Sequence, residues 1–458
     1  MKTGIINSKT LLRSNLGYRI DPDVHLSDGV QAREQLTLSP YDLSTVGENA
    51  SKVFLGNIFS RVFVKDIKHG MPYLAASDTV LANIETGRYL SHKQVKKLKY
   101  LILKSDWILI TCSGTLGNVI YTNKTFENHI ATHDLIRVIP NDNKVNKGTL
   151  YAFLSGKYGY NQITQSQFGG VVKHINDVQT KSILVPVFPE SFQQEVDDLI
   201  QESARLREEA ADVLQQAIQQ IEKIIPYPAK KNVKCVSSRT ILSSHNKRFE
   251  ANYYISEGHD IEEYIYKHFT WKPLGEVCED ISRPDIFKRY YVQNGIVFLG
   301  GADIFLSNPD SKKQLSKSKT ANINSLTIKE NTILIPRSGT IGNVAWAHAG
   351  HAQKLASEHV IRLQPNDMLK GGYIYAFLSS SIGKALIQKH IFGSVIQHIE
   401  PPHLKLIPIP IIEDSIIDDI HNWVIEYSKK VGMAIEKEKK AISMVEQEID
   451  SWSARKEN

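Results

Sequence analysis

The chain has 458 residues, of which 41% are hydrophobic and 23% are charged, and its formal net charge is +6 at pH 7. This length accommodates two to three domains, and the mild positive charge permits an anionic partner without requiring one. The three cysteines form no CxxC pair, which argues against a disulfide framework or a zinc site. No run approaches the roughly 18 apolar residues of a membrane span, and no signal-peptide pattern opens the sequence. The composition therefore predicts a soluble protein of the cytoplasm.

The chain contains one series of sequence blocks twice, in the same order. In chain order the matched pairs are Arg19–Gly29 with Arg248–Gly258, Pro72–Asp78 with Val297–Asp303, Ser113–Val119 with Ser338–Val344, Ile136–Pro140 with Ile361–Pro365, Tyr151–Ser155 with Tyr375–Ser379, and Phe168–Ile175 with Phe392–Ile399. The spacing is nearly constant at about 225 residues, which is the size of a domain. The repeat therefore indicates a duplicated domain rather than a solenoid.

The clearest block is Ser-Gly-Thr-[Leu/Ile]-Gly-Asn-Val, which begins at Ser113 and again at Ser338. A β-like run precedes each copy and another follows it, so the pattern predicts a strand, a glycine-bearing turn and a second strand. Elsewhere each copy alternates short β-like runs with brief helical ones, such as Ser91–Lys99. Each copy is therefore predicted to form an α/β domain with a strand-rich core.

Each copy ends in a long stretch with apolar residues at heptad spacing. The positions that predict a seam include Phe192, Val196, Leu199, Leu206 and Val213 in the first stretch and Ile420, Trp423, Tyr427, Val431 and Val445 in the second. Sustained heptads predict two helices of about 35 and about 40 residues, each with one apolar stripe. A stripe of this kind must be buried, and the simplest partner for one helix is the other, packed as an antiparallel coiled coil.

This arrangement resembles the specificity subunit of type I restriction-modification systems, and the resemblance covers essentially the whole chain. The Arg19 and Arg248 blocks, the Ser113 and Ser338 loops, the two Phe-Gly blocks and the two terminal helices carry it. The resemblance implies two α/β target-recognition domains, residues 1–190 and 232–412, each of which reads one half of a bipartite DNA sequence. Residues 191–231 and 413–458 are then a spacer helix with its linker and a C-terminal spacer helix.

The resemblance also implies partners. The helices dock two methyltransferase subunits, a restriction-translocase subunit joins the larger assembly, and S-adenosylmethionine is expected in the methyltransferase subunit rather than in this chain. By this analogy the chain catalyses nothing. The two copies have clearly diverged, as at His25 and Tyr254, and this suits an asymmetric DNA target better than a palindrome.

Residues that both copies share are expected to serve common tasks, whereas base-reading residues are expected where the copies differ. The DNA-contact candidates are Lys93, Lys96, Lys97, Ser113, Thr115 and Lys173 in the first copy and Lys312, Lys313, Lys317, Arg337, Ser338 and Thr340 in the second. For the lysines, phosphate contact and a merely solvated surface remain alternatives. Arg337 is the sharper candidate for guanine recognition, because Cys112 replaces it in the first copy. Other base readers are expected within residues 79–105, 121–135, 304–330 and 346–360.

The sequence lacks the motifs of three kinds of catalytic site. The nearest approach to a methyltransferase Asn/Asp-Pro-Pro-aromatic loop is Glu400–His403, which has the wrong residues on both sides. A nuclease would need a second acid beside Asp310, and neither Ser-Gly-Thr loop has the Gly-Lys-Ser/Thr of a P-loop. For His174 and His398 a structural or partner-facing role is favoured, with DNA contact and metal binding as alternatives. A self-contained restriction or modification enzyme and a protein-binding scaffold remain the competing hypotheses.

Overall fold

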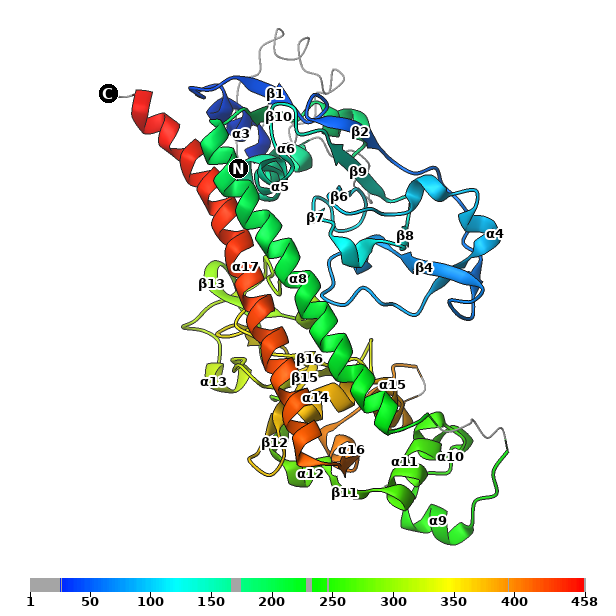
Figure 1. The fold of residues 1–458 in the computed structure, drawn as a ribbon. Helices are drawn as coiled ribbons and strands as arrows, with labels where there is room; N and C mark the ends of the chain where they lie inside the picture. Colours follow the sequence, from blue (N-terminus) through cyan, green and yellow to red (C-terminus); the bar gives the residue numbers. More distant parts are fainter. Residues whose placement is uncertain are drawn as a thin grey trace. The chain divides into compact units, whose positions relative to one another are not determined.

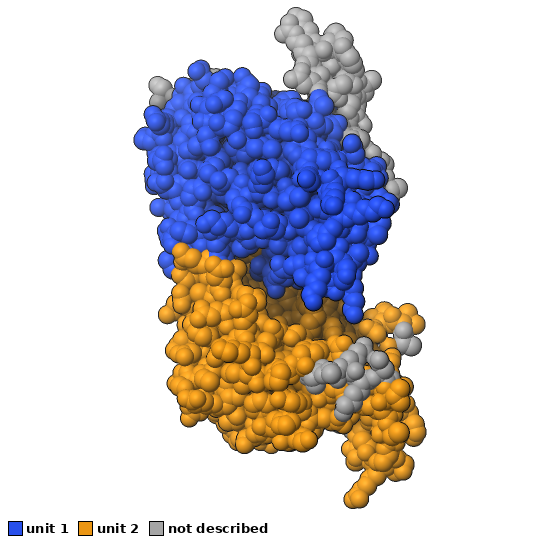
Figure 2. Space-filling view, turned by 45° about the vertical axis from the view of Figure 1, so that its right-hand side comes forward, with its two compact units in different colours: residues 1–208, 433–458 blue, residues 209–432 orange. Residues whose placement is uncertain are grey.

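The computed structural model describes residues 25, 27–165, 174–227, 233–244, 247–393 and 395–456. The chain divides into two compact units, residues 1–208 with 433–458 and residues 209–432 (Figure 2). We call residues 27–189 of the first unit the first head and residues 248–413 of the second unit the second head. The predicted domain bounds are not the bounds of these units, because both long helices are divided between them, and those bounds stay a prediction.

The first head is built on a four-stranded sheet in the order β2-β9-β6-β7. Its strands are β2 (Ala50–Phe54), β9 (Leu135–Pro140), β6 (Ile108–Thr111) and β7 (Val119–Tyr121). A second sheet, in the order β3-β5-β4-β8, consists of β3 (Phe63–Val64), β5 (Tyr89–Ser91), β4 (Gly70–Leu74) and β8 (Ile130–Ala131). A further pair joins β1 (Leu43–Thr45) to β10 (Leu184–Pro186).

The second head repeats this plan. Its main sheet has the order β12-β18-β15-β16, formed by β12 (Cys278–Ser282), β18 (Val360–Pro365), β15 (Ile333–Pro336) and β16 (Ala345–Trp346). Another sheet contains β14 (Gln314–Leu315), β13 (Tyr291–Leu299) and β17 (Leu355–Ala356), and β11 (Thr270–Pro273) pairs with β19 (Pro408–Ile411). In both heads the first strand of the main sheet has a register irregularity, and one strand pair of the second sheet is parallel. The duplication predicted from the sequence is confirmed by this shared strand order.

Helices accompany the sheets in both heads (Figure 1), and four helices of the first head recur at matched positions along the chain in the second. The first head contains α3 (Asp28–Leu36), α4 (His92–Val95), α5 (Lys147–Ser155), α6 (Lys157–Gln165) and α7 (Asp177–Lys181). The second unit contains α9 (Ser238–Ser243), α10 (Ala251–Tyr254), α11 (Glu257–His268), α12 (Leu274–Val277), α13 (Ile323–Leu326), α14 (Gly371–Ser379), α15 (Ser381–Lys389) and α16 (Pro401–Leu404). Gly258 at the start of α11 lies so close to α15 that an added Cβ would fall 2.2 Å from the Ala385 carbonyl oxygen. Gly29 of α3 also packs closely against α6, where an added Cβ would fall 2.6 Å from the Asn161 carbonyl oxygen. This close packing explains why the glycine recurs.

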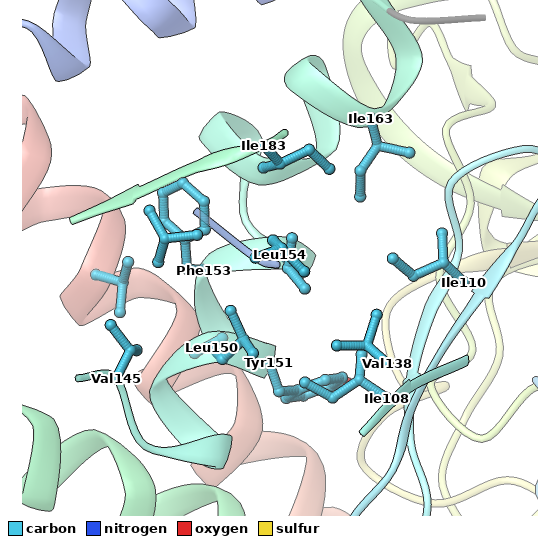
Figure 3. Close-up of a cluster of buried hydrophobic side chains, with 14 of the residues drawn as sticks. Ile108, Ile110, Val138, Val145, Leu150, Tyr151, Phe153, Leu154, Ile163 and Ile183 are labelled. Atoms are coloured by element: carbon cyan, nitrogen blue, oxygen red, sulfur yellow. The ribbon is translucent and has the colours of Figure 1, made fainter. Parts of the chain in front are cut away.

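The core of the first head lies between the main sheet and helix α5. Ile108 and Ile110 of β6 and Val138 of β9 point toward Tyr151 and Leu154 of α5 (Figure 3). The same buried cluster includes Val445 and Trp452 from the C-terminal helix, so that helix is part of the core of the first unit.

The two long helices are α8 (Glu190–Ile224), with 35 residues, and α17 (Asp414–Lys456), with 43. Within the first unit they run antiparallel, since Phe188, just before α8, contacts Trp452 near the end of α17, with ring centroids 6.2 Å apart. Farther along, the Ser203 hydroxyl donates to the Ala434 carbonyl oxygen at 2.8 Å. In the second unit the Lys430 ammonium lies 2.6 Å from the Glu209 carboxylate. The predicted mixed α/β fold with two long helices is confirmed.

Most of the predicted seam positions are buried. Val196, Leu206, Ile420, Tyr427, Val431 and Val445 are buried, and Phe192, Leu199, Val213 and Trp423 are partly buried. The heptad pattern missed Ile200, Val424 and Ile435, which are also buried. None of the described helices combines the length and the apolar character that a membrane crossing requires.

Candidate functional site

The Ser-Gly-Thr loop joins two antiparallel strands of the main sheet in each head, as the sequence predicted. Gly114 and Gly117 in the first loop and Gly339 and Gly342 in the second have φ between 69° and 105°. This left-handed backbone favours glycine, which explains why both glycines of the loop recur in the second copy. Thr115 and Thr340 lie exposed in the loops.

In both heads a backbone bridge joins the first residue of this loop to the histidine of the Phe-Gly block. Ser113 forms an isolated β-bridge with His174, and Ser338 forms the same bridge with His398. The bridge gives both histidines a structural backbone role, whatever their side chains contact. Among the residues that the structure describes, no group of three or more His, Cys, Asp or Glu side chains is placed to hold a metal ion.

A buried arginine supports the main sheet in each head. Arg137 in β9 and Arg362 in β18 occupy matched positions, and both guanidinium groups donate to backbone carbonyls. The acceptors are Ala131, Thr132 and Leu135 in the first head and Leu326, Ala356 and Val360 in the second, at 2.8 to 3.2 Å. Burial lowers the pKa of each arginine to about 10. These arginines recur in a matched sequence block, and burial assigns them to the fold rather than to a ligand.

The position before each Ser-Gly-Thr loop keeps the same backbone but not the same side chain. The carbonyl oxygen of Cys112 accepts a hydrogen bond from the Ile175 N–H at 3.2 Å, and that of Arg337 accepts one from the Ile399 N–H at 3.0 Å. Cys112 is buried, and burial raises the pKa of its thiol to about 12. Arg337 instead reaches Glu400, and 2.6 Å separates its Nε from the carboxylate Oε1.

Glu400 also binds Arg283, whose Nε lies 2.8 Å from Oε2. Burial alone would raise the pKa of Glu400, but the hydrogen bonds from Arg283 and Arg337 outweigh it and hold that pKa below its usual value. The carboxylate is therefore charged at neutral pH. Arg283 and Glu400 lie outside the segments in which base readers were expected.

Both heads expose an isoleucine that the sequence comparison overlooked. Ile58 is 86% exposed and Ile286 is 85% exposed. The strand registers place them at equivalent positions, three residues after Leu55 and Arg283 respectively. The next residue, Phe59 or Phe287, packs against a buried cluster in each case. Because the exposed isoleucine recurs at the matched position, this loop is a candidate contact surface in both heads. Aligning Asn57–Arg61 with Asp285–Arg289 would have found it.

The lysines singled out from the sequence lie at the surface. Lys93, Lys96, Lys97, Lys312, Lys313 and Lys317 are all exposed, the first three on or just after α4 and the others around β14. Lys173 lies outside the described residues. The exposed positions are compatible with phosphate contact and with a solvated surface alike.

Residues 56–223 and 266–418 match the family model described as the type I restriction modification DNA specificity domain. These ranges take in most of the chain and correspond to its two halves. The chain belongs to this DNA specificity family. It is accordingly a DNA-recognition subunit of a type I restriction-modification system, and the paired heads are its specificity domains.

Solved structures of the family are similar over most of this specificity subunit. A type I restriction-modification S subunit from M. genitalium is 13% identical, with 90% of this chain and 96% of that chain covered and a TM-score of 0.34. The HsdS subunit from Thermoanaerobacter tengcongensis is 14% identical, with 90% and 96% covered and a TM-score of 0.29. The search of curated proteins found no match. The family assignment rests on the matched sequence and not on these structural likenesses.

Proposed function

We propose that each head of this specificity subunit reads one half of a bipartite, asymmetric DNA site, and that the chain itself is not a catalyst. The observation that supports this best is that the main sheets of the two heads have the same strand order, whereas the side chains on their loops differ. A shared frame suits the contacts that any duplex offers, whereas differing side chains suit two different half-sites. The exposed lysines and the Thr115 and Thr340 hydroxyls are proposed to contact the DNA backbone.

Helices α8 and α17 are proposed to set the distance between half-sites and to dock two methyltransferase subunits. An α-helix of 35 residues has a length of about 50 Å, which exceeds one turn of duplex DNA, about 34–36 Å. Because the apolar stripe of each helix is buried, docking would use the polar outward positions. The methyltransferase would hold S-adenosylmethionine, and restriction-translocase subunits would join the larger complex.

The test is to incubate genomic DNA and S-adenosylmethionine with the purified chain, with a methyltransferase subunit, or with both, and to map the methylated sites. We expect methylation at one two-part sequence only when both proteins are present. Methylation by the chain alone would contradict the proposal and favour a self-contained modification enzyme.

A second experiment tests the spacer. One heptad is inserted in α8 between Glu208 and Glu209 and one in α17 between Gly432 and Met433, at the boundaries of the two units. Seven residues lengthen each helix by about 10 Å, or about three base pairs. We expect the gap in the methylated sequence to change while both half-sites keep their bases, and an unchanged gap would exclude the spacer role.

A further inference from the structure

Three loops of the second head meet at one charged cluster, which we call the Arg-Glu-Arg cluster: Arg283, Arg337 and Glu400. Arg283 follows β12, Arg337 follows β15, and Glu400 directly precedes α16 (Figure 1). The three side chains are 27%, 21% and 21% exposed, in that order, so the cluster is partly open to solvent.

One carboxylate is shared by two guanidinium groups, so the cluster keeps a net positive charge. Arg337 donates its Nε–H to Glu400. A guanidinium has five N–H donors, and one held through Nε still has its two Nη groups at the far end. A pair of donors of this kind is what bidentate binding to guanine O6 and N7 requires. Fixing the group in advance lowers the entropy lost on binding.

The first head shows that the cluster is not needed to build the frame. The strand registers and the two β-bridges match Arg283 to Leu55, Arg337 to Cys112 and Glu400 to Asn176. All three charges are absent there, yet the sheet order is the same.

The N-cap position shows the same contrast in detail. Asn176 caps α7 by accepting a hydrogen bond from the Gln179 N–H at 2.8 Å. Glu400 is the N-cap of α16 and makes no side-chain cap. Its carboxylate is committed to the arginines instead, which indicates a task other than helix capping.

The cluster also lies beside surface that suits a ligand. The loop that Arg283 begins carries the exposed Ile286, and the segment that Glu400 ends carries Val395, which is 93% exposed. Arg283 further lines an open pocket together with Thr320, Asn322, Asn324 and Ser325. Apolar tips contact thymine methyl groups, and hydroxyl and amide side chains bond base edges.

We propose that Arg337 reads a guanine in the half-site of the second head, and that Glu400 and Arg283 are positioning residues that hold its guanidinium for that contact. This proposal rests on the proposed function above. The exposed isoleucines, present in both heads, mark the surface that faces DNA, and the Arg-Glu-Arg cluster, present in one, supplies specificity.

The experiment compares the complete complex carrying wild-type chain with complexes carrying Arg337→Gln, Arg337→Lys or Glu400→Gln, and maps methylated sites on genomic DNA. Loss of a bidentate contact lowers discrimination at one base pair by about 10- to 100-fold. We expect Arg337→Gln and Arg337→Lys to make one guanine position of one half-site degenerate. We expect Glu400→Gln to weaken preference at that same position by a smaller factor, because Arg337 is present but less fixed. Cys112→Ala, the matched control in the first head, should leave the whole sequence unchanged.

The proposal is overturned if Arg337→Gln and Arg337→Lys both keep the wild-type sequence preference. It is equally overturned if methylation falls uniformly at all sites with an unchanged sequence, since that pattern belongs to a phosphate contact. Arg337→Lys guards against misfolding because it keeps the charge. If the wild-type complex methylates no two-part sequence, the proposed function itself fails, and this outcome is distinct from an unchanged preference in the variants.

Discussion

In the first head, Asn176 uses its side chain to cap the short helix α7, whereas in the second head the matched residue, Glu400, binds two arginines. Both residues begin the same helix of the same frame. The same backbone plan therefore forms with different side chains at the bases of its loops. Duplicated features such as the buried arginines maintain the plan, and unmatched features such as the Arg-Glu-Arg cluster are free to distinguish one head from the other.

The largest expected effect concerns the shared plan. Arg137→Met and Arg362→Met each remove buried hydrogen bonds to backbone carbonyls, and each should destabilise its own head by about 3 to 5 kcal/mol. Hydrogen exchange of peptides from each head measures this separately. If either substitution costs less than about 1 kcal/mol, the buried arginine is not the support that both heads share.

The second prediction concerns acid sensitivity, which should differ between the heads. His351 is buried in the second head, where the first has Phe126, and burial lowers the pKa of His351 to about 4. Its neutral form therefore stabilises the head fully above pH 6.5, the ordinary value, and this contribution is lost as the pH falls from about 6.5 to about 4. The loss is on the order of 3 kcal/mol.

Between pH 7 and pH 4.5 the second head should lose more amide protection against hydrogen exchange than the first head. The substitution His351→Phe should reduce that loss of protection. His421, whose pKa burial also lowers, accepts the Gly372 N–H through Nδ1 at 3.1 Å and adds to the same trend. Equal loosening of both heads, with no benefit from His351→Phe, would contradict this difference.

A smaller effect is expected where α8 departs from its apolar stripe. Ser203 is buried, and its hydroxyl donates to the Ala434 carbonyl oxygen. Ser203→Ala should lower the free energy of unfolding by about 1 kcal/mol, the usual value for one hydrogen bond. Thermal unfolding against Ser451→Ala, a change at a partly exposed position of α17, provides the comparison. A gain in stability would mean that the hydrogen bond does not offset burial of the hydroxyl.

The smallest effect on stability is expected from exchanging the cluster for its first-head counterparts. The free energy of unfolding of the triple variant Arg283→Leu, Arg337→Cys, Glu400→Asn should lie within about 1 kcal/mol of the wild-type value. Removing all three charged side chains together leaves none of them buried without a partner. Glu400→Leu alone should be worse, since it leaves two arginines facing each other. If the triple variant fails to fold, the Arg-Glu-Arg cluster is required for the folding of the second head.

Much of the fold could be predicted because the chain repeats itself. The glycines of the Ser-Gly-Thr loop and the heptads of α8 and α17 are local patterns whose geometry follows from residue type. The burial of Arg137 was not predictable, since an arginine within a strand is equally compatible with a surface position. The partnership of Arg283 with Glu400 spans residues far apart in sequence and emerges only from the pairing of β12 with β18 and the place of α16. Ile200 was missed because it lies beside the strict heptad positions.

Replacing residues 256–413 with a second copy of residues 27–189 tests whether each head reads its own half-site on a shared backbone plan. The complete complex carrying this chain is then used to methylate genomic DNA, and the methylated sequence is mapped. We expect the methylated sequence to contain the half-site of the first head twice and the half-site of the second head not at all. A methylated sequence that still contains the second half-site would contradict this expectation.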